Sequence, residues 1–214
     1  MDATAPLGRH LTEIWLIRHG QTEWNTEKRF QGRQDSPLTE LGQQQALAAG
    51  RWLATSRFSS AWCSPASRAQ STAALLNSCR EKPLEFRTSE ALAEMHFGEW
   101  EGRTRPEIEA RWGEPARQFW NAPELWQPFG GESFLQAQER VTSFVSRLQP
   151  ATDPVLLISH GMSIQLLLHA IRAKPFARLH ETPFVLQASL TKLRIATEFA
   201  PSGWEIVVAG QILS

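Results

Sequence analysis

Two short apolar segments of the chain each end in a histidine followed by a glycine. Ile14 to Ile17 leads into Arg18-His19-Gly20, and Val155 to Ile158 leads into Ser159-His160-Gly161. Apolar runs of this length are typical of buried strands, and the ligand crevices of open α/β sheets lie at the carboxyl ends of the strands. If both strands are central and parallel, the two imidazoles reach the same edge of the sheet.

A third segment supplies another cation. Residues 58–63 predict a strand that ends at Ser64-Pro65, and the following helix presents Arg68 from its first turn. Arg18 and Arg68 suit a phosphate because a guanidinium donates two parallel hydrogen bonds. A neutral imidazole is a competent nucleophile near pH 7. The chemistry that these side chains could perform together is phosphoryl transfer.

The elements that must position these residues alternate along the chain. The patterns predict strands over 12–18, 58–63, 83–87, 154–159, 184–196 and 204–208, and helices over 39–53, 65–76, 132–148 and 164–171. Residues 1–10 resemble a loose leader, and residues 201–203 a hairpin turn. We therefore expect one domain over 1–214, a three-layer α/β/α sandwich with a mostly parallel sheet.

The region from about 89 to 131 departs from this alternation. It contains four prolines and two short helical patterns, over 105–112 and 115–120. We predict a small helical lid inserted over the sheet, since long irregular segments of compact domains are usually functional. For the tryptophans in and near this region we favour core positions over the wall of a pocket: Trp24, Trp100, Trp112, Trp120 and Trp126.

Composition excludes several classes of protein. Lys+Arg and Asp+Glu both number 22 in 214 residues, which argues against a general nucleic-acid binder. No run of 18 apolar residues predicts a membrane span, and no secretory signal is expected. Cys63 and Cys79 are expected to be reduced thiols, and no histidines have zinc-ligand spacing. We expect a cytoplasmic protein without a metal; the late strands leave a homodimer open.

Six motifs, in order between about residues 13 and 210, resemble the histidine phosphatase superfamily, in its phosphoglycerate mutase-like branch. They are Arg-His-Gly-Gln-Thr-Glu-Trp-Asn at 18–25, Ser-Pro-Leu-Thr-Glu-Leu-Gly at 36–42, Ser-Pro-Ala-Ser-Arg-Ala at 64–69, Glu-Met-His-Phe-Gly-Glu-Trp-Glu-Gly at 94–102, Gly-Gly-Glu-Ser at 130–133 and Ser-His-Gly at 159–161. One such motif is a weak signal, but six in order are specific.

The resemblance implies a role for each matching residue. His19 is similar to the nucleophile that forms a phosphohistidine, and Glu94 to the proton donor. The residues that would hold the phosphoryl oxygens are Arg18, Arg68 and His160, with Thr22 and Asn25 as supporting donors. We also assign Gly20, Gln31, Gly32 and Gly161 to substrate binding. No cofactor or metal is implied.

The superfamily contains mutases and phosphatases. The mutases carry a longer insertion with an adjacent Arg pair and a Tyr that grip a carboxylate, whereas Phe97 stands at the Tyr position here. Arg103, Arg105 and Arg111 could substitute for the pair in part. Residues 97–102 are more similar to broad-specificity phosphatases and α-ribazole phosphatases.

We therefore predict a metal-independent hydrolase of small phosphomonoesters that acts through a phosphohistidine. The alternatives are a cofactor-dependent phosphoglycerate mutase and, from another class, a non-catalytic phosphate-ligand sensor. A zinc hydrolase is a weaker rival.

Overall fold

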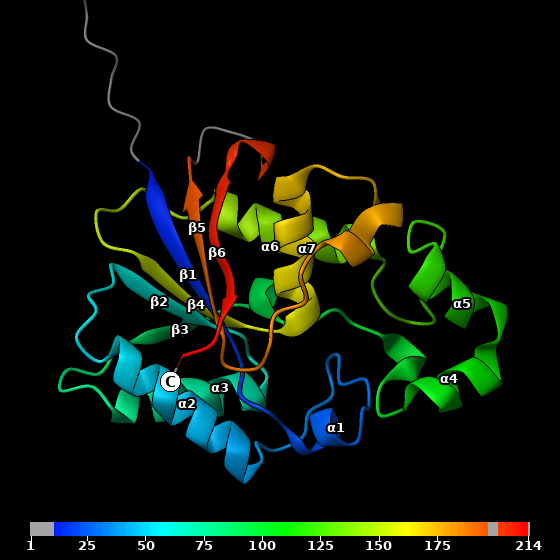
Figure 1. Ribbon diagram of the computed structural model, residues 1–214, viewed down its shortest axis with the longest axis horizontal. Helices are drawn as coiled ribbons and strands as arrows, with labels where there is room; N and C mark the ends of the chain where they lie inside the picture. The colour runs from blue at the N-terminus through cyan, green and yellow to red at the C-terminus, as the bar shows by residue number, and fades with distance from the viewer. Residues whose placement is uncertain (1–10, 197–200, 214) are drawn as a thin grey trace, which may run out of the picture.

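The computed structural model describes residues 11–196 and 201–213, and this part of the chain holds one six-stranded sheet (Figure 1). The strands lie in the order β3-β2-β4-β1-β5-β6. Their bounds are β1 (Thr12–Arg18), β2 (Ser60–Cys63), β3 (Phe86–Thr88), β4 (Val155–Ser159), β5 (Leu190–Ile195) and β6 (Glu205–Gln211). The leader expected at 1–10 lies outside the described residues.

Strand β1 lies in the middle of the sheet and aligns the ends of its neighbours. It pairs in parallel with β4, where Arg18 is opposite Ser159, and β2 pairs in parallel with both β4 and β3. The amide of His19 extends this alignment by donating to the carbonyl of Ser159 over 3.0 Å. β5 and β6 are antiparallel additions at one edge. The carboxyl ends of β1, β2 and β4 therefore meet, as the two His-Gly sequences predict.

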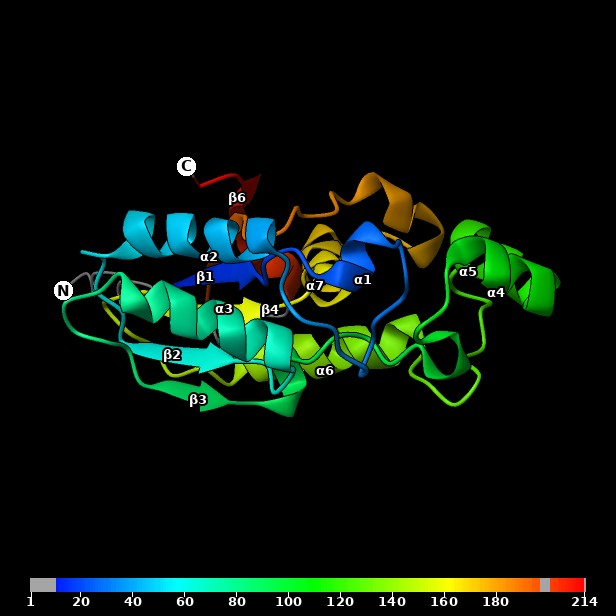
Figure 2. The same cartoon turned by 90° about the horizontal axis from the view of Figure 1, so that it is seen from below.

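Helices cover both faces of the sheet (Figures 1 and 2). α2 (Glu40–Leu53) and α3 (Ser67–Ser78) lie on one face, and α6 (Phe134–Ser146) and α7 (Gly161–Arg172) on the other. Successive side chains of β1 point to opposite faces of the sheet, so Leu16 packs into the core under α6 and α7 and Ile17 packs into the core under α2 and α3. The predicted three-layer α/β/α sandwich with a mostly parallel sheet is confirmed.

The predicted lid helices are α4 (Arg105–Trp112) and α5 (Glu114–Asn121), which extend to one end of the molecule (Figure 1). Below them lies a separate aromatic core in which the rings of Phe119 and Trp126 are each 5.2 Å from Trp100. This core reaches the body through Phe134 of α6 and Leu166 of α7. It gives the lid a hydrophobic centre of its own.

Several predicted boundaries were wrong, most of them by a few residues. β2 begins at Ser60 and not at residue 58, and α3 begins at Ser67, so Pro65 precedes the helix. α6 is shorter than the predicted 132–148, and α7 begins at Gly161 and not at residue 164. The short elements are α1 (Glu23–Thr26), η1 (Glu90–Leu92), η2 (Gly98–Trp100), η3 (Phe176–Glu181) and η4 (Pro201–Gly203), the last standing where the hairpin turn was expected.

The largest error concerns residues 184–189, which were predicted as the start of a strand that runs to 196. These residues form a loop, and β5 begins at Leu190. The loop turns because Ala188 adopts a positive φ of 53° and donates its amide to the carbonyls of Arg18 and His19. The segment is therefore shaped by contacts at the end of β1 and not by its own apolar pattern.

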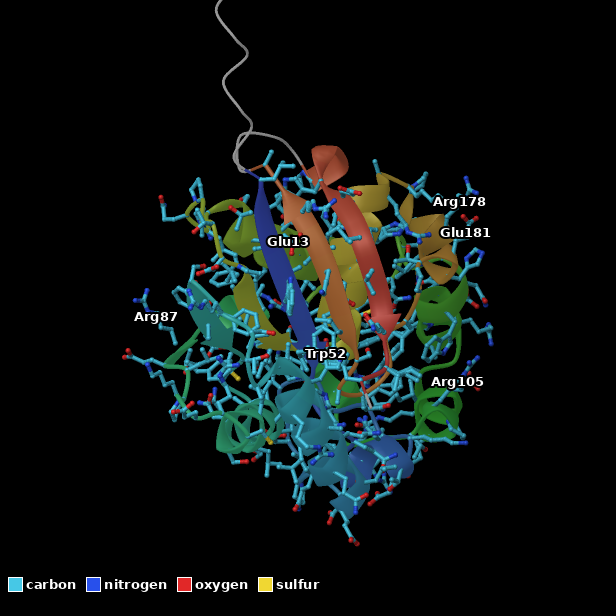
Figure 3. The ribbon with its side chains drawn as sticks, turned by 60° about the vertical axis from the view of Figure 1, so that its left-hand side comes forward. Glu13, Trp52, Arg87, Arg105, Arg178 and Glu181 are labelled. Carbon is cyan, nitrogen blue, oxygen red and sulfur yellow. The ribbon has the colours of Figure 1, made fainter. Side chains whose placement is uncertain are left out.

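Many charged side chains lie at the periphery. Figure 3 shows Arg87, Arg105 and Arg178 pointing away from the body, with Arg178 beside Glu181 at an ion-pair distance of 2.6 Å. Within 11–196 and 201–213, the chain forms no helix that is long and apolar enough to cross a lipid bilayer.

Candidate active site

His19 follows β1 directly and is almost fully buried. Its Nδ1 lies 2.7 Å from the carbonyl oxygen of Gly20. A carbonyl can only accept, so Nδ1 carries the proton and Nε2 carries the free lone pair. Burial, followed by the charges of Arg68 and Arg18, holds the pKa of His19 well below its ordinary value. His19 is therefore a neutral imidazole with an unprotonated Nε2.

His160 stands between β4 and α7, with its ring centroid 5.1 Å from that of His19. It is completely buried, and its Nε2 lies 2.7 Å from the Ser64 hydroxyl oxygen. Burial, Arg68 and His19 hold the pKa of His160 well below its ordinary value. The two imidazoles thus come together as the sequence predicts.

Arg18 is held from two sides by the loop that follows residue 183. Its Nη1 donates to the carbonyl of Val185 over 2.8 Å, and its guanidinium carbon lies 4.8 Å from the centre of the Phe184 ring. Burial lowers the pKa of Arg18 to about 10, so this side chain is still charged at neutral pH. The cation is fixed and desolvated, as binding of an anion requires.

Arg68 extends from the first turn of α3 into the loop at residues 32–35. Nη2 donates to the carbonyl of Gly32, and Nη1 donates to the carbonyl of Gln34 and to a carboxylate oxygen of Asp35, all at 2.8–2.9 Å. Asp35 also accepts from the amide of Ser67. These contacts occupy the outer side of the guanidinium and fix its orientation.

Three buried nitrogens of this cluster have no hydrogen-bond partner within the described residues: Arg18 Nε, Arg68 Nε and His160 Nδ1. Buried polar groups are nearly always paired, so such orphaned groups need an explanation. They belong to β1, α3 and the β4–α7 junction, which meet beside His19. A tetrahedral oxyanion is the kind of ligand that the two guanidinium groups suit, because cationic side chains are the usual phosphate ligands in proteins.

Glu94 is held at the start of α7. One carboxylate oxygen accepts from the amides of Met95 (2.9 Å) and Ser163 (3.0 Å), and the other from the amide of Met162 (3.1 Å). A helix N-terminus favours a carboxylate at this position. Glu94 is thus held in a defined orientation at the edge of the site.

The two neighbouring glutamates have other roles. Glu99 is exposed and pairs with Arg111. Glu101 is buried, and accepts from the backbone amides of Arg33 and Gln34, which ties the lid to the loop that holds Arg68. Neither lines the cavity that Glu94 faces. Of the three glutamates, Glu94 is therefore the one that lines the cavity.

A cavity of about 290 Å³ opens beside His19, and the predicted site residue His160 is not among the residues that line it. Its floor contains Arg18, His19, Arg68 and Glu94, and its other lining residues are Trp24, Asn25, Lys28, Arg29, Phe30, Gln31, Gly32, Phe97, Phe119, Trp120, Met162 and Phe184. An apolar wall with a few convergent polar groups is typical of small-molecule sites. Trp100 and Trp126 are core residues as predicted, whereas Trp24 and Trp120 belong to this wall.

Of the supporting residues, Asn25, Gln31 and Gly32 line the cavity. Thr22 does not: it is fully buried, and its hydroxyl accepts from Gln31 (2.7 Å) and from the amide of Asn25 (3.2 Å). Its hydroxyl therefore holds two cavity residues in place and does not face the cavity.

The two glycines after the histidines also lie outside the lining residues, and close packing explains both. A Cβ on Gly20 would lie 2.3 Å from the carbonyl oxygen of Gly42. A Cβ on Gly161 would lie 2.6 Å from the Phe184 ring and 3.0 Å from the guanidinium carbon of Arg18. Both positions therefore require glycine, because any larger side chain would collide with these neighbouring groups.

Sequence reasoning missed Asp35, Ser64 and the loop carrying Phe184. Ser64 lies inside a quoted motif and Asp35 directly precedes another, but no local pattern shows that they touch His160 and Arg68. Within the described segments, no group of three or more His, Cys, Asp or Glu side chains could hold a metal ion.

Comparisons with known proteins identify the family of this chain. The family model of the histidine phosphatase superfamily (branch 1) matches residues 14–210. A 2,3-bisphosphoglycerate-dependent phosphoglycerate mutase of Bartonella tribocorum is 33% identical over 202 residues, which cover 91% of this chain and 94% of the relative. A glucosyl-3-phosphoglycerate phosphatase of Mycolicibacterium vanbaalenii is 36% identical over 169 residues, which cover 75% of this chain and 74% of the relative.

A solved structure is also similar to this chain. The α-ribazole phosphatase of Shigella flexneri superposes with a TM-score of 0.81 at 28% identity, covering 94% of this chain and 96% of the other. The likeness extends over nearly the whole of both chains and includes the sheet that carries the site. The chain belongs to the histidine phosphatase superfamily, branch 1.

Proposed function

We propose that this protein hydrolyses phosphomonoesters of small metabolites through a phosphohistidine on His19, without a metal ion. The observation that carries the proposal is the set of three buried nitrogens, unpartnered within the described residues, beside a neutral imidazole. The site combines a nucleophile, donors for the phosphoryl oxygens and a carboxyl group for the leaving oxygen. Phosphoryl transfer depends mainly on such positioning and electrostatic stabilisation.

In the first step, Nε2 of His19 attacks phosphorus and the bond to the ester oxygen breaks. Charge on the equatorial oxygens is stabilised by Arg18, Arg68 and His160. Protonated Glu94 donates its proton to the leaving alkoxide. The oxygen that accepts only from Met162 is the better carrier of this proton, because the other one accepts from Met95 and Ser163.

In the second step, water attacks the phosphohistidine. Glu94, now a carboxylate, accepts a proton from the water, the phosphorus–nitrogen bond breaks, and His19 regains its lone pair. Inorganic phosphate leaves and the carboxyl group is protonated again. Glu94 thus acts as acid in one step and base in the other, at one position in the site.

The lid supports hydrolysis over transfer back to a phosphoglycerate. Arg105 pairs with Glu109, and its guanidinium carbon lies 4.5 Å from the centre of the Trp120 ring. The Arg103 guanidinium packs over Trp112. In the described part of the chain, no arginine of the insertion lines the cavity, where Phe97 contributes an apolar wall instead. The carboxylate grip of a mutase is therefore missing from the lid.

Mutase activity is the second candidate, because one observation favours it. Lys28 lines the cavity, and within the described part of the chain its ammonium group makes no hydrogen bond or ion pair. This cation could receive the carboxylate of a phosphoglycerate, and the Bartonella tribocorum relative carries the mutase name.

Steady-state assays separate these functions. The purified protein should release phosphate from p-nitrophenyl phosphate in the presence of EDTA, and His19→Ala should abolish the release. Interconversion of 2- and 3-phosphoglycerate far faster than hydrolysis would replace our proposal by the mutase. If the protein binds phosphate without turnover and no phosphohistidine can be trapped, the protein is a non-catalytic phosphate-ligand sensor.

We also place this activity in the cytoplasm. The two cysteines are unpaired, with Cys63 buried in the core and Cys79 partly buried. Unpaired thiols fit a reducing compartment. The charge balance of 22 basic and 22 acidic residues fits a small phosphate ester as ligand better than a nucleic acid.

A further inference from the structure

The Ser64 side chain contacts His160 from the end of β2. It is completely buried, and its Oγ lies 2.7 Å from His160 Nε2. The same oxygen accepts from the amide of Ala66 over 3.3 Å, just before α3. Ser64 thus lies between the start of the helix that carries Arg68 and the second histidine of the site.

An inventory of protons assigns the direction of this contact. The Ser64 hydroxyl carries one proton, and within the described residues the only acceptor that it reaches is His160 Nε2. The amide of Ala66 is a donor, so it can receive nothing from the hydroxyl. If Nε2 carried the imidazole proton, the hydroxyl proton would be buried without an acceptor, which is destabilising.

We infer that Ser64 is a positioning residue that donates its hydroxyl proton to Nε2 of His160 and thereby fixes the tautomer with a proton on Nδ1. His160 Nδ1 is the buried ring atom for which the described structure shows no partner. Its N–H is then available to a phosphoryl oxygen. The catalytic consequence rests on the proposed function, whereas the tautomer assignment does not.

The assignment explains how two neutral histidines serve opposite purposes. Both carry the proton on Nδ1. In His19 that proton is bound by the carbonyl of Gly20, so Nε2 offers a lone pair to phosphorus. In His160 the hydroxyl of Ser64 occupies Nε2, so Nδ1 offers a proton to oxygen. The partner of each ring, and not its charge, decides its role.

Nuclear magnetic resonance tests the tautomer directly. In wild-type protein labelled with ¹⁵N-histidine, with His160 assigned by its loss in His160→Gln, Nε2 should have the shift of an unprotonated nitrogen and Nδ1 that of a protonated one. Ser64→Ala should move these shifts toward a mixture of tautomers. The control Ser159→Ala, which removes a buried hydroxyl bonded to the carbonyl of Leu92, should leave them unchanged.

Kinetics test the consequence. Ser64→Ala should lower kcat for p-nitrophenyl phosphate about tenfold or more, and Ser64→Thr, which keeps the hydroxyl, should restore most of it. A protonated Nε2 in the wild-type protein, or a Ser64→Ala enzyme within about twofold of wild type, would overturn the inference. If the tautomer is as stated while His19→Ala still hydrolyses the ester, the proposed function fails and the assignment stands.

Discussion

Replacing Glu94 by glutamine tests the two proton-transfer steps separately. The change preserves the shape of the side chain, and an amide oxygen can still accept from the amides of Met95 and Ser163. The amide NH₂ would face the amide of Met162 and lose that single hydrogen bond. The folded site should therefore survive, at a cost of about 1–3 kcal/mol in the free energy of unfolding.

The kinetic effect should depend on the leaving group. General acid–base catalysis by one side chain contributes about 10²–10⁴ in rate, or roughly 3–5 kcal/mol. An alkyl phosphate needs the proton of Glu94, so Glu94→Gln should slow its cleavage by this factor. Nitrophenolate leaves without a proton, so phosphorylation of His19 by p-nitrophenyl phosphate should fall less than about tenfold. Attack of water then lacks its base.

A stopped-flow assay follows from this difference. Glu94→Gln mixed with excess p-nitrophenyl phosphate should release about one nitrophenolate per active site in a burst, followed by a slow steady state. Acid-labile phosphate should be trapped on His19 during that phase. Equal losses for alkyl and nitrophenyl esters, with no burst and no trapped intermediate, would refute the assignment of Glu94 as acid and base.

Three further outcomes are expected. The pKa values of His19 and His160 are depressed in the folded protein, so the unfolded chain binds protons at these residues first as the pH falls. The free energy of unfolding should therefore decrease as the pH drops below about 6.5. Urea unfolding between pH 8 and 5 measures this decrease, and His19→Asn should make the free energy of unfolding depend less on pH. Trp100→Ala should cost about 3–5 kcal/mol in urea unfolding, whereas Trp100→Phe should cost much less, since it also removes a buried indole N–H that is unpartnered in the described structure. Dialysis against EDTA should leave kcat unchanged, because the described residues hold no metal-ligand cluster; a loss restored by Zn²⁺ would contradict the mechanism.

The parts of the fold that local patterns specify were predicted well. β1 was placed at its observed bounds of Thr12–Arg18, because an apolar run ends there in Arg-His-Gly. Thr39 caps α2 as its position before Glu40 indicates, with its hydroxyl accepting from the amide of Gly42. In both places, the physical cause lies within a few residues of its effect.

The errors concern residues whose structure depends on distant partners. Residues 184–189 have an apolar pattern typical of a strand. In the structure, however, the carbonyl of Val185 accepts a hydrogen bond from Arg18, which is 167 residues away in the sequence. Thr22 resembles a phosphate donor in its motif, but its hydroxyl holds Gln31. Ser64 and Asp35 gain their importance only when the fold brings His160 and Arg68 beside them. Such contacts have no signature in one sequence.

The aromatic centre of the lid has a consequence for how this protein can change. Trp100, Phe119 and Trp126 belong to a cluster that contacts α6 at Phe134 and α7 at Leu166 and is separate from the two hydrophobic layers that support the sheet. Phe97 and Trp120 face the cavity from that separate unit. Exchange of these two side chains would alter which alcohol fits while the phosphate-binding floor keeps its foundation. Selectivity can therefore diverge at little risk to the catalytic frame.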